Sequence, residues 1–165
     1  MSLINKLIFN AEHAEKVFPR VASAGGAFDF RSLVPIPVNI YRGPQTAGHS
    51  DFCNNRYYNF NVWANDNWGS YGNCYAGQNG VLENGSAFVM FKSHIGTLKK
   101  CPYPIIVAFA NTFEIPFIYR YYEMQGSTWG IETWDRAEFE PYIHRVAFRH
   151  KDDRDKKELF NEFKA

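Results

Sequence analysis

Histidine and cysteine are the residue types that most often bind metal ions, and their spacing is the first chemistry that this sequence can be tested for. The chain has five histidines and three cysteines. A metal site on a helix needs two such side chains three or four residues apart, and a zinc ribbon needs Cys-x-x-Cys pairs. The sequence has no Cys-x-x-Cys pair and no His-x-x-x-His motif. His49 and Cys53 would share a face if their segment were helical. We expect no metal and no other cofactor, with this pair as the alternative.

The sequence lacks the usual motifs for nucleophilic catalysis and for phosphate binding. There is no Gly-x-Ser-x-Gly sequence, and the adjacent Ser93 and His94 would point to opposite faces of a strand. The glycines at 69–72 and 77–80 are typical of turns and do not form a phosphate-binding loop. The paired carboxylates are typical of a solvated edge rather than of acid–base catalysis. These pairs are Glu132 with Asp135, and Glu138 with Glu140. We expect a protein that is not an enzyme.

Composition and charge exclude several other classes. Hydrophobic residues make up 45% of the 165 residues and charged residues 21%, which indicates one globular domain rather than a disordered chain. The net charge of +1 gives no general attraction to nucleic acid or to a membrane surface. Neither a signal peptide nor an apolar run long enough to span a membrane is visible. Three widely spaced cysteines indicate free thiols in a cytoplasmic protein.

Aromatic residues are in surplus, at 18% of the chain. Their densest cluster with amide side chains lies between residues 63 and 75. Two interpretations stay open for it: a folded insertion whose rings pack against the core, or a recognition surface with aromatic anchors. The candidate binding residues are Trp63, Asn67, Trp68, Tyr71, Asn73 and Tyr75.

The elements that must position these residues follow from apolar patterning. A strand is predicted over 3–9, and a helix over 11–24 that Asn10 caps and Gly25-Gly26 ends. Residues 38–73 form an insertion, with a second helix from about 52 to 65 capped by Asp51 and a loop after it.

The rest of the chain predicts a hairpin, a helix and further strands. Strands over 74–82 and 86–93 are joined by Glu83-Asn84-Gly85. Pro102 and Pro104 open a helix over 103–113, and strands follow over 115–124 and 127–134. A short helix fits 152–163. Without the insertion the order is β-α-β-β-α-β, which predicts an α+β fold with a ferredoxin-like split βαβ antiparallel sheet. We expect one domain over 1–165, with its core in 1–134 and a helical C-terminal extension over 135–165.

Apolar side chains on both faces of the central strands predict that both faces of the sheet are covered. Phe117, Tyr119 and Tyr121 alternate with Ile118, Arg120 and Tyr122. The insertion helix and the C-terminal helix are the natural covers of the second face. Such a cover argues against an open aromatic platform for single-stranded nucleic acid.

Two segments of the sequence resemble a known family. Phe28-Asp29-Phe30 followed by Leu33-Val34-Pro35-Ile36-Pro37 is similar to the family's FDF…P-x-P run, and Trp63…Asn67-Trp68-Gly69…Asn73 resembles its W…NWG…N segment. Together with the order of elements over residues 3–134, they resemble the phage- and plasmid-borne family named for the YubB ferredoxin-like domain. Here the loop over 38–55 is longer, and Tyr71 or Cys74 stands where the family has a second tryptophan. The resemblance implies the fold and a setting in mobile elements, and it implies no reaction.

These observations predict a non-enzymatic accessory protein of a phage or other mobile element that binds a host protein in the host cytoplasm. Inhibition of host defence, such as a CRISPR effector, is the favoured role. A nucleic-acid-binding module in replication or recombination is the alternative, and a homodimer stays open.

Overall fold

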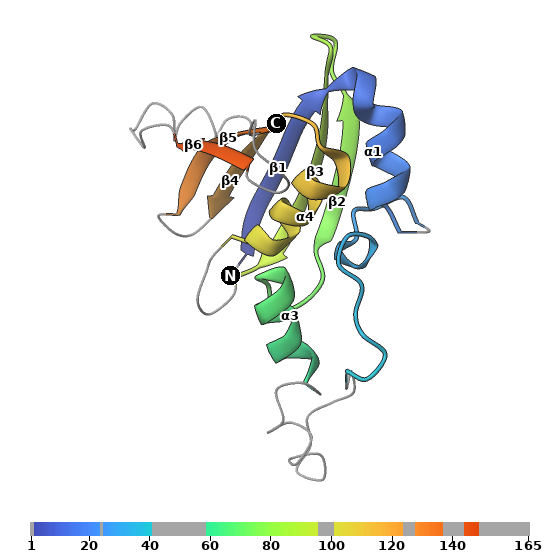
Figure 1. Cartoon of the computed structure of the whole chain (residues 1–165), viewed down its shortest axis with the longest axis vertical. Coiled ribbons are helices and arrows are strands. Elements are labelled where there is room, and N and C mark those ends of the chain that lie inside the picture. The colour runs from blue at the N-terminus through green and yellow to red at the C-terminus, as the bar shows by residue number, and fades with distance from the viewer. Residues whose placement is uncertain are drawn as a thin grey trace.

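The computed structural model describes residues 2–23, 25–40, 59–95, 101–123, 128–136 and 144–148 (Figure 1). Its helices and strands, in chain order, are β1 (Ser2–Asn10), the 3-10 turn η1 (Ala11–His13), α1 (Ala14–Val21), the 3-10 turn η2 (Phe30–Ser32), α3 (Phe60–Trp68), β2 (Tyr75–Val81), β3 (Ser86–His94), α4 (Tyr103–Phe113), β4 (Phe117–Glu123), β5 (Trp129–Arg136) and β6 (His144–Phe148).

One antiparallel sheet contains all six of these strands, in the order β2-β3-β1-β4-β5-β6. β1 is central, and its Leu7 lies opposite Val89 on one side and Tyr119 on the other. The predicted α+β class and antiparallel sheet are therefore confirmed. The sheet is wider than the predicted four-stranded core because β5 and β6 extend it beyond β4.

Local sequence signals explain two turns: the one that follows β1 and the one that joins β2 to β3. The Asn10 side chain accepts a hydrogen bond from the Glu12 N–H and so caps η1, as predicted. In the hairpin, Gly85 takes the left-handed conformation with φ +83°, and Asn84 Oδ1 accepts the N–H of Ser86. The predicted turn between β2 and β3 is confirmed.

Helices α1 and α4 bury the residues that the helical spacing selects. In α1, Ala14, Val17 and Val21 are buried, although the α-helix is shorter than the predicted 11–24 and ends two residues after the exposed Pro19. In α4 the buried residues recur at helical spacing within the predicted range 103–113. They are Ile105, Ile106, Phe109, Ala110 and Phe113.

The insertion helix differs from the prediction at both ends. Asn59 has an extended backbone and caps α3, so the helix begins at Phe60 rather than running unbroken from about residue 52, and it continues through Trp68 instead of ending near residue 65. The proposed start near residue 52, with its cap at Asp51, lies outside the described residues. Gly69 ends the helix at φ +71°, where a Cβ atom would lie 3.1 Å from the Cys101 carbonyl oxygen and 3.0 Å from the Pro104 ring. Glycine is therefore required both for the turn and for the close approach of α4.

The three α-helices in the described residues share one core on one face of the sheet, here called the helix face, which carries Leu7, Val89 and Tyr119. In Figure 1, α4 lies across β1 and β3. Ala64 and Trp68 of α3 belong to this same core, so the prediction that the insertion helix covers the second face is wrong. The amphipathic pattern of a helix shows that it packs, but not on which face of a sheet. The predicted helix over 152–163 lies outside the described residues.

The opposite face of the sheet carries Lys6, Met90 and Arg120. A small second core lies on this face at β4 and β5 and consists of Tyr122, Trp129 and Ile131. Within the predicted helical extension, the structure has the strand β6, paired to β5. In the described part of the chain, no helix is long and apolar enough to span a bilayer.

Candidate binding surface

Trp68, one of the six candidate binding residues, is a core residue. Its side chain is fully buried, and its indole N–H donates a 2.9 Å hydrogen bond to the Val34 carbonyl oxygen. The ring makes edge-to-face contacts with the rings of Phe30, Phe60 and Trp63. Trp68 therefore joins the insertion to the segment before it and is not available to a partner.

Asn73 is also structural. Its Oδ1 atom accepts the backbone N–H groups of Phe30 and Cys74, each at 2.9 Å, and its amide donates to Asp29 Oδ1 at 2.8 Å. The Cys74 thiol donates to the Phe28 carbonyl oxygen at 3.0 Å, and burial raises the pKa of this thiol to about 12. The FDF and NWG…N segments thus pack against each other, which fixes the loop between α3 and β2.

The remaining candidates differ in exposure. Trp63 is half-buried against Trp68, and the exposed Asn67 donates its amide to the Trp63 carbonyl oxygen at 2.9 Å. Tyr71 is 39% exposed and Tyr75 is 40% exposed.

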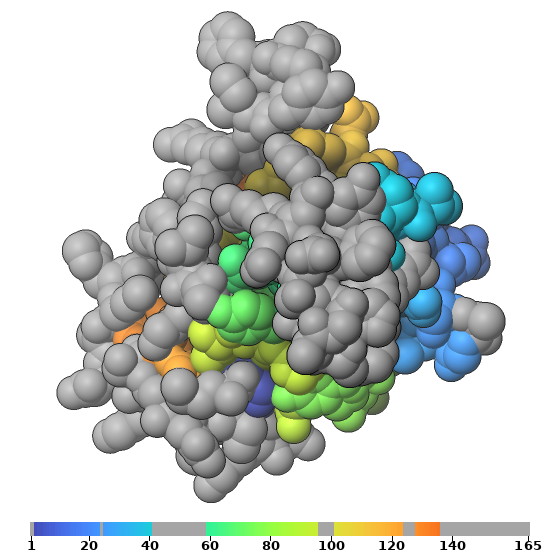
Figure 2. All heavy atoms as spheres, turned by 90° about the horizontal axis from the view of Figure 1, so that it is seen from below, coloured from blue at the N-terminus to red at the C-terminus, as the bar shows by residue number. Residues whose placement is uncertain are grey.

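His94 joins the two tyrosines, and sequence reasoning missed it. Its ring packs on that of Tyr75 with 4.9 Å between centroids, and it lines a hollow of about 530 Å³ together with Tyr71, Gly72 and Ile95. The predicted hairpin turn at residues 83–85 could have indicated this contact, because it pairs β2 with β3 and so brings Tyr75 close to His94 at the end of β3. We call Tyr71, Tyr75 and His94 the tyrosine patch. Viewed from below, atoms of residues 59–81 (green) and of β3 (yellow-green) lie beside one another at the surface (Figure 2).

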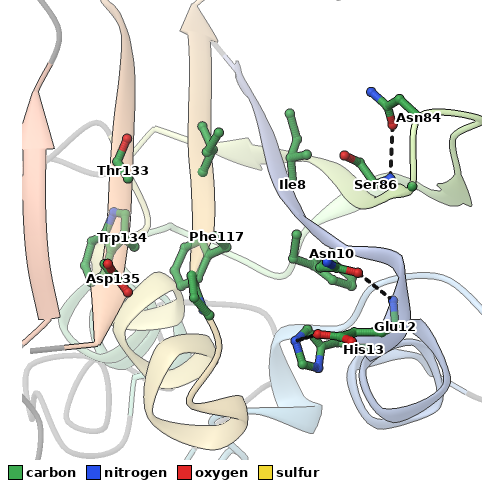
Figure 3. A pocket seen from close by; sticks show the side chains of 14 residues that line it. Ile8, Asn10, Glu12, His13, Asn84, Ser86, Phe117, Thr133, Trp134 and Asp135 are labelled. Carbon is green, nitrogen blue, oxygen red and sulfur yellow. Dashed lines mark hydrogen bonds and ion pairs between the residues drawn. The ribbon is translucent and has the colours of Figure 1, made fainter.

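A second hollow, of about 550 Å³, lies where β1 and β4 separate beyond their last pair, Ile8 and Ile118. Figure 3 shows Glu12 and His13 on one side of it and Asp135 on the other. Phe117 and Trp134, whose rings stack at 5.6 Å, form part of its apolar lining.

The chemistry of this second hollow does not amount to a nucleophilic site. A hydrolytic triad would need Ser86, His13 and Glu12 in one hydrogen-bonded chain. His13 Nε2 lies 3.3 Å from Glu12 Oε1, but in Figure 3 Asn10 lies between His13 and Ser86. The Ser86 backbone N–H is held by Asn84, on the far side from His13. Its described lining residues therefore offer polar contacts without an activated nucleophile.

A buried polar cluster lies between the sheet and the start of α4. Glu132 is fully buried and accepts hydrogen bonds from the Tyr103 hydroxyl and, at 3.0 Å, from the Trp134 indole. Tyr119 donates to Asn5 Oδ1 at 2.7 Å. Burial raises the pKa of both Tyr103 and Tyr119 well above the usual range, so both remain neutral donors. The interpretation of Glu132 as part of a solvated edge is wrong, because its side chain is fully buried and hydrogen-bonded to Tyr103 of α4 and to Trp134 of its own strand.

The other predicted site residues are distributed as follows. Ser93 is buried and accepts a hydrogen bond from the Asn5 amide at 2.9 Å, whereas His94 is exposed, as strand alternation predicts. Cys74 and Cys101 are thiols and not half-cystines. His49, Cys53, Glu138 and Glu140 lie outside the described residues. Within the described ranges, no three His, Cys, Asp or Glu side chains are grouped closely enough to hold a metal ion.

The chain was compared with models of protein families, with curated proteins and with solved structures, and none of the three comparisons gives a match.

Proposed function

We propose that this chain is a non-enzymatic binding protein and that the tyrosine patch contacts a partner protein. The observation that carries the proposal is the exposure of Tyr71, on a loop whose conformation is fixed by Trp68 and Asn73, and of Tyr75, at the start of β2 directly after that loop. Tyrosine offers a large contact area and a hydroxyl at a low cost in conformational entropy. A rigid loop lowers that cost further, because little ordering remains to be done on binding.

The partner class comes from the sequence resemblance. The YubB-like motifs favour a phage or plasmid origin, so the proposed partner is a host protein in the host cytoplasm. Defence proteins such as CRISPR effectors are the favoured targets, and inhibition by occupying a surface needs no cofactor. The mutual packing of Phe30 and Trp68 gives a physical reason why the two motifs occur together.

We also propose that the core is a ferredoxin-like split βαβ unit. The elements β1-α1-β2-β3-α4-β4, with strand order β2-β3-β1-β4 and both helices on one face, support this assignment. On this proposal α3 is an insertion, and β5 and β6 are additions at the β4 edge.

Capture from host lysate tests the proposed function. Immobilised wild-type protein should retain a host protein that the Tyr71→Ala/Tyr75→Ala variant does not. Val107→Ala is the matched control, because Val107 is 39% exposed and lies on α4, which carries no residue of the patch. Equal retention by all three proteins would reject the patch as the contact surface.

Nucleic-acid binding is the second candidate, and one observation on the opposite face favours it. The Lys6 ammonium lies 4.9 Å from the centre of the Phe88 ring, and Lys92 lies opposite Tyr75. Basic and aromatic side chains on one sheet face suit single-stranded nucleic acid. Binding of a single-stranded oligonucleotide that weakens steeply with salt, and is lost in Lys6→Gln/Lys92→Gln, would favour this candidate.

A further inference from the structure

The strand β2 is an edge of the sheet with little protection against pairing. It is first in the strand order and pairs only with β3 among the described strands. From Tyr75 to Leu82 the sequence has no charged residue and no proline, the two features that most often block an edge. Val81 is 59% exposed and Leu82 is 39% exposed. This edge is therefore a template on which another strand can add.

The hairpin determines which backbone groups point outward. Leu82 donates its N–H to the Ser86 carbonyl oxygen at 2.7 Å. In an antiparallel ladder, bonded and non-bonded pairs alternate, so Gly80 next bonds inward to its partner Phe88. The N–H and C=O groups of Asn79 and Val81 consequently point away from β3, along the outer edge.

We propose that two copies of this chain form a dimer by antiparallel pairing of β2 with β2. Gly80 lies on the two-fold axis, opposite Gly80 of the second copy. Asn79 of each copy then lies opposite Val81 of the other, and the outward groups of both residues make four hydrogen bonds across the interface. A second copy is the favoured occupant because this edge is self-complementary in that register.

Neighbouring residues select the same register. Glu83, the first charged residue after β2, lies opposite Gly77 of the second copy, so no like charges meet. Shifting the axis to Asn79 would bring Val81 of the second copy against Gly77. A Cβ atom there would already lie 2.9 Å from the Phe28 backbone nitrogen, so the site is crowded. With the axis on Gly80, the absence of a side chain allows the two strands to approach closely.

The dimer is weak, because pairing of one short edge buries little surface. Sedimentation of the full chain from about 10 μM to about 1 mM should show an increasing dimer fraction. Val81→Pro removes two of the four hydrogen bonds and none within the hairpin, since that N–H points outward. Dimer affinity should fall at least about 30-fold. Val81→Ala keeps the N–H and should retain the dimer. A monomer at every concentration, or a Val81→Pro dimer as tight as the wild type, would overturn the proposal.

A cross-link tests the register without depending on affinity. Gly80→Cys places two thiols across the axis, at a Cα separation of about 4.5 Å that a disulfide can span. The new Cβ atom lies 3.0 Å from the outer edge of the Phe88 ring, which must shift by a few tenths of an ångström to make room. Mild oxidation should yield a dimer linked through residue 80, identified by mass spectrometry of the joined peptide. Asn84→Cys, in the exposed turn, is the control and should not cross-link. Equal cross-linking of both variants would contradict the register.

Discussion

Replacing Trp68 by alanine should destabilise the fold severely, although a tryptophan beside Asn67 and Gly69 has the sequence context of a recognition loop. The side chain is fully buried, and its ring contacts three other aromatic rings. Its N–H satisfies the Val34 carbonyl oxygen just before the Pro35–Pro37 segment. The substitution therefore leaves a cavity and also removes a buried hydrogen bond.

The magnitude follows from these two losses. Truncating a buried tryptophan to alanine costs about 3–5 kcal/mol of unfolding free energy, and the lost hydrogen bond adds about 1 kcal/mol. A domain of this size loses about 2–4 °C of melting temperature per kcal/mol, so Tm should fall by about 10 °C or more. Trp68→Phe keeps most of the ring but not the donor. It should cost clearly less than Trp68→Ala.

Urea unfolding followed by circular dichroism measures this difference. Tyr71→Ala is the matched control, because it removes an aromatic ring three residues later from an exposed position. We expect it to change the unfolding free energy by less than about 1 kcal/mol. If Trp68→Ala unfolded at the same urea concentration as Tyr71→Ala, the placement of Trp68 in the core would be wrong.

Three further predictions concern the buried polar groups. Glu132→Gln places an amide N–H₂ group against one of the two donors, and it should lower the free energy of unfolding by about 2 kcal/mol in urea titrations. The exposed Glu83→Gln is the control and should leave that free energy unchanged. Equal effects of the two substitutions would contradict the buried cluster. Burial alone would raise the pKa of Asp29, but hydrogen bonds from Arg31 and an amide lower it below its usual 3.8. The ionised Asp29 carboxylate therefore stabilises the fold above about pH 4, and this stabilisation is lost as the pH falls further. Asp29→Asn should reduce the dependence of the unfolding free energy on pH below about pH 4. An unchanged pH dependence would refute the lowered pKa of Asp29. Because its pKa is raised to about 12, the Cys74 thiol should be alkylated at pH 8 at least about a hundredfold more slowly than glutathione. Peptide mapping by mass spectrometry measures this rate. A rate comparable to that of glutathione would show that the thiol is accessible.

The sequence predicted the elements whose signals are local. Pro102 and the apolar spacing of residues 105–113 define α4, and Gly85 after Asn84 defines the hairpin. The end of α3 was missed although Gly69 marks it, because the asparagines near Trp68 favour a loop when judged by propensity alone. A single glycine stop signal was more informative there than composition.

Long-range pairing explains the remaining errors. Nothing near Glu132 in the sequence shows that Tyr103 provides one of its two hydrogen-bond donors, so an acid in a charged stretch was interpreted as solvated. The same limit applies to the binding surface. Trp68 and Tyr71 are three residues apart, yet Trp68 is buried and Tyr71 is exposed, because the rings of Phe30, Phe60 and Trp63 and the Val34 carbonyl group pack around Trp68.

The affinity of the captured host partner for the Tyr71→Ala/Tyr75→Ala variant, measured together with its melting temperature, is the most direct test of the tyrosine patch. Each exposed anchor should contribute about 2 kcal/mol, which is about 30-fold in dissociation constant, while Tm stays within a few degrees of the wild type. Val107→Ala should bind as the wild type does. Unchanged affinity of the double variant, or an affinity loss accompanied by a large fall in Tm, would contradict a binding role for the patch.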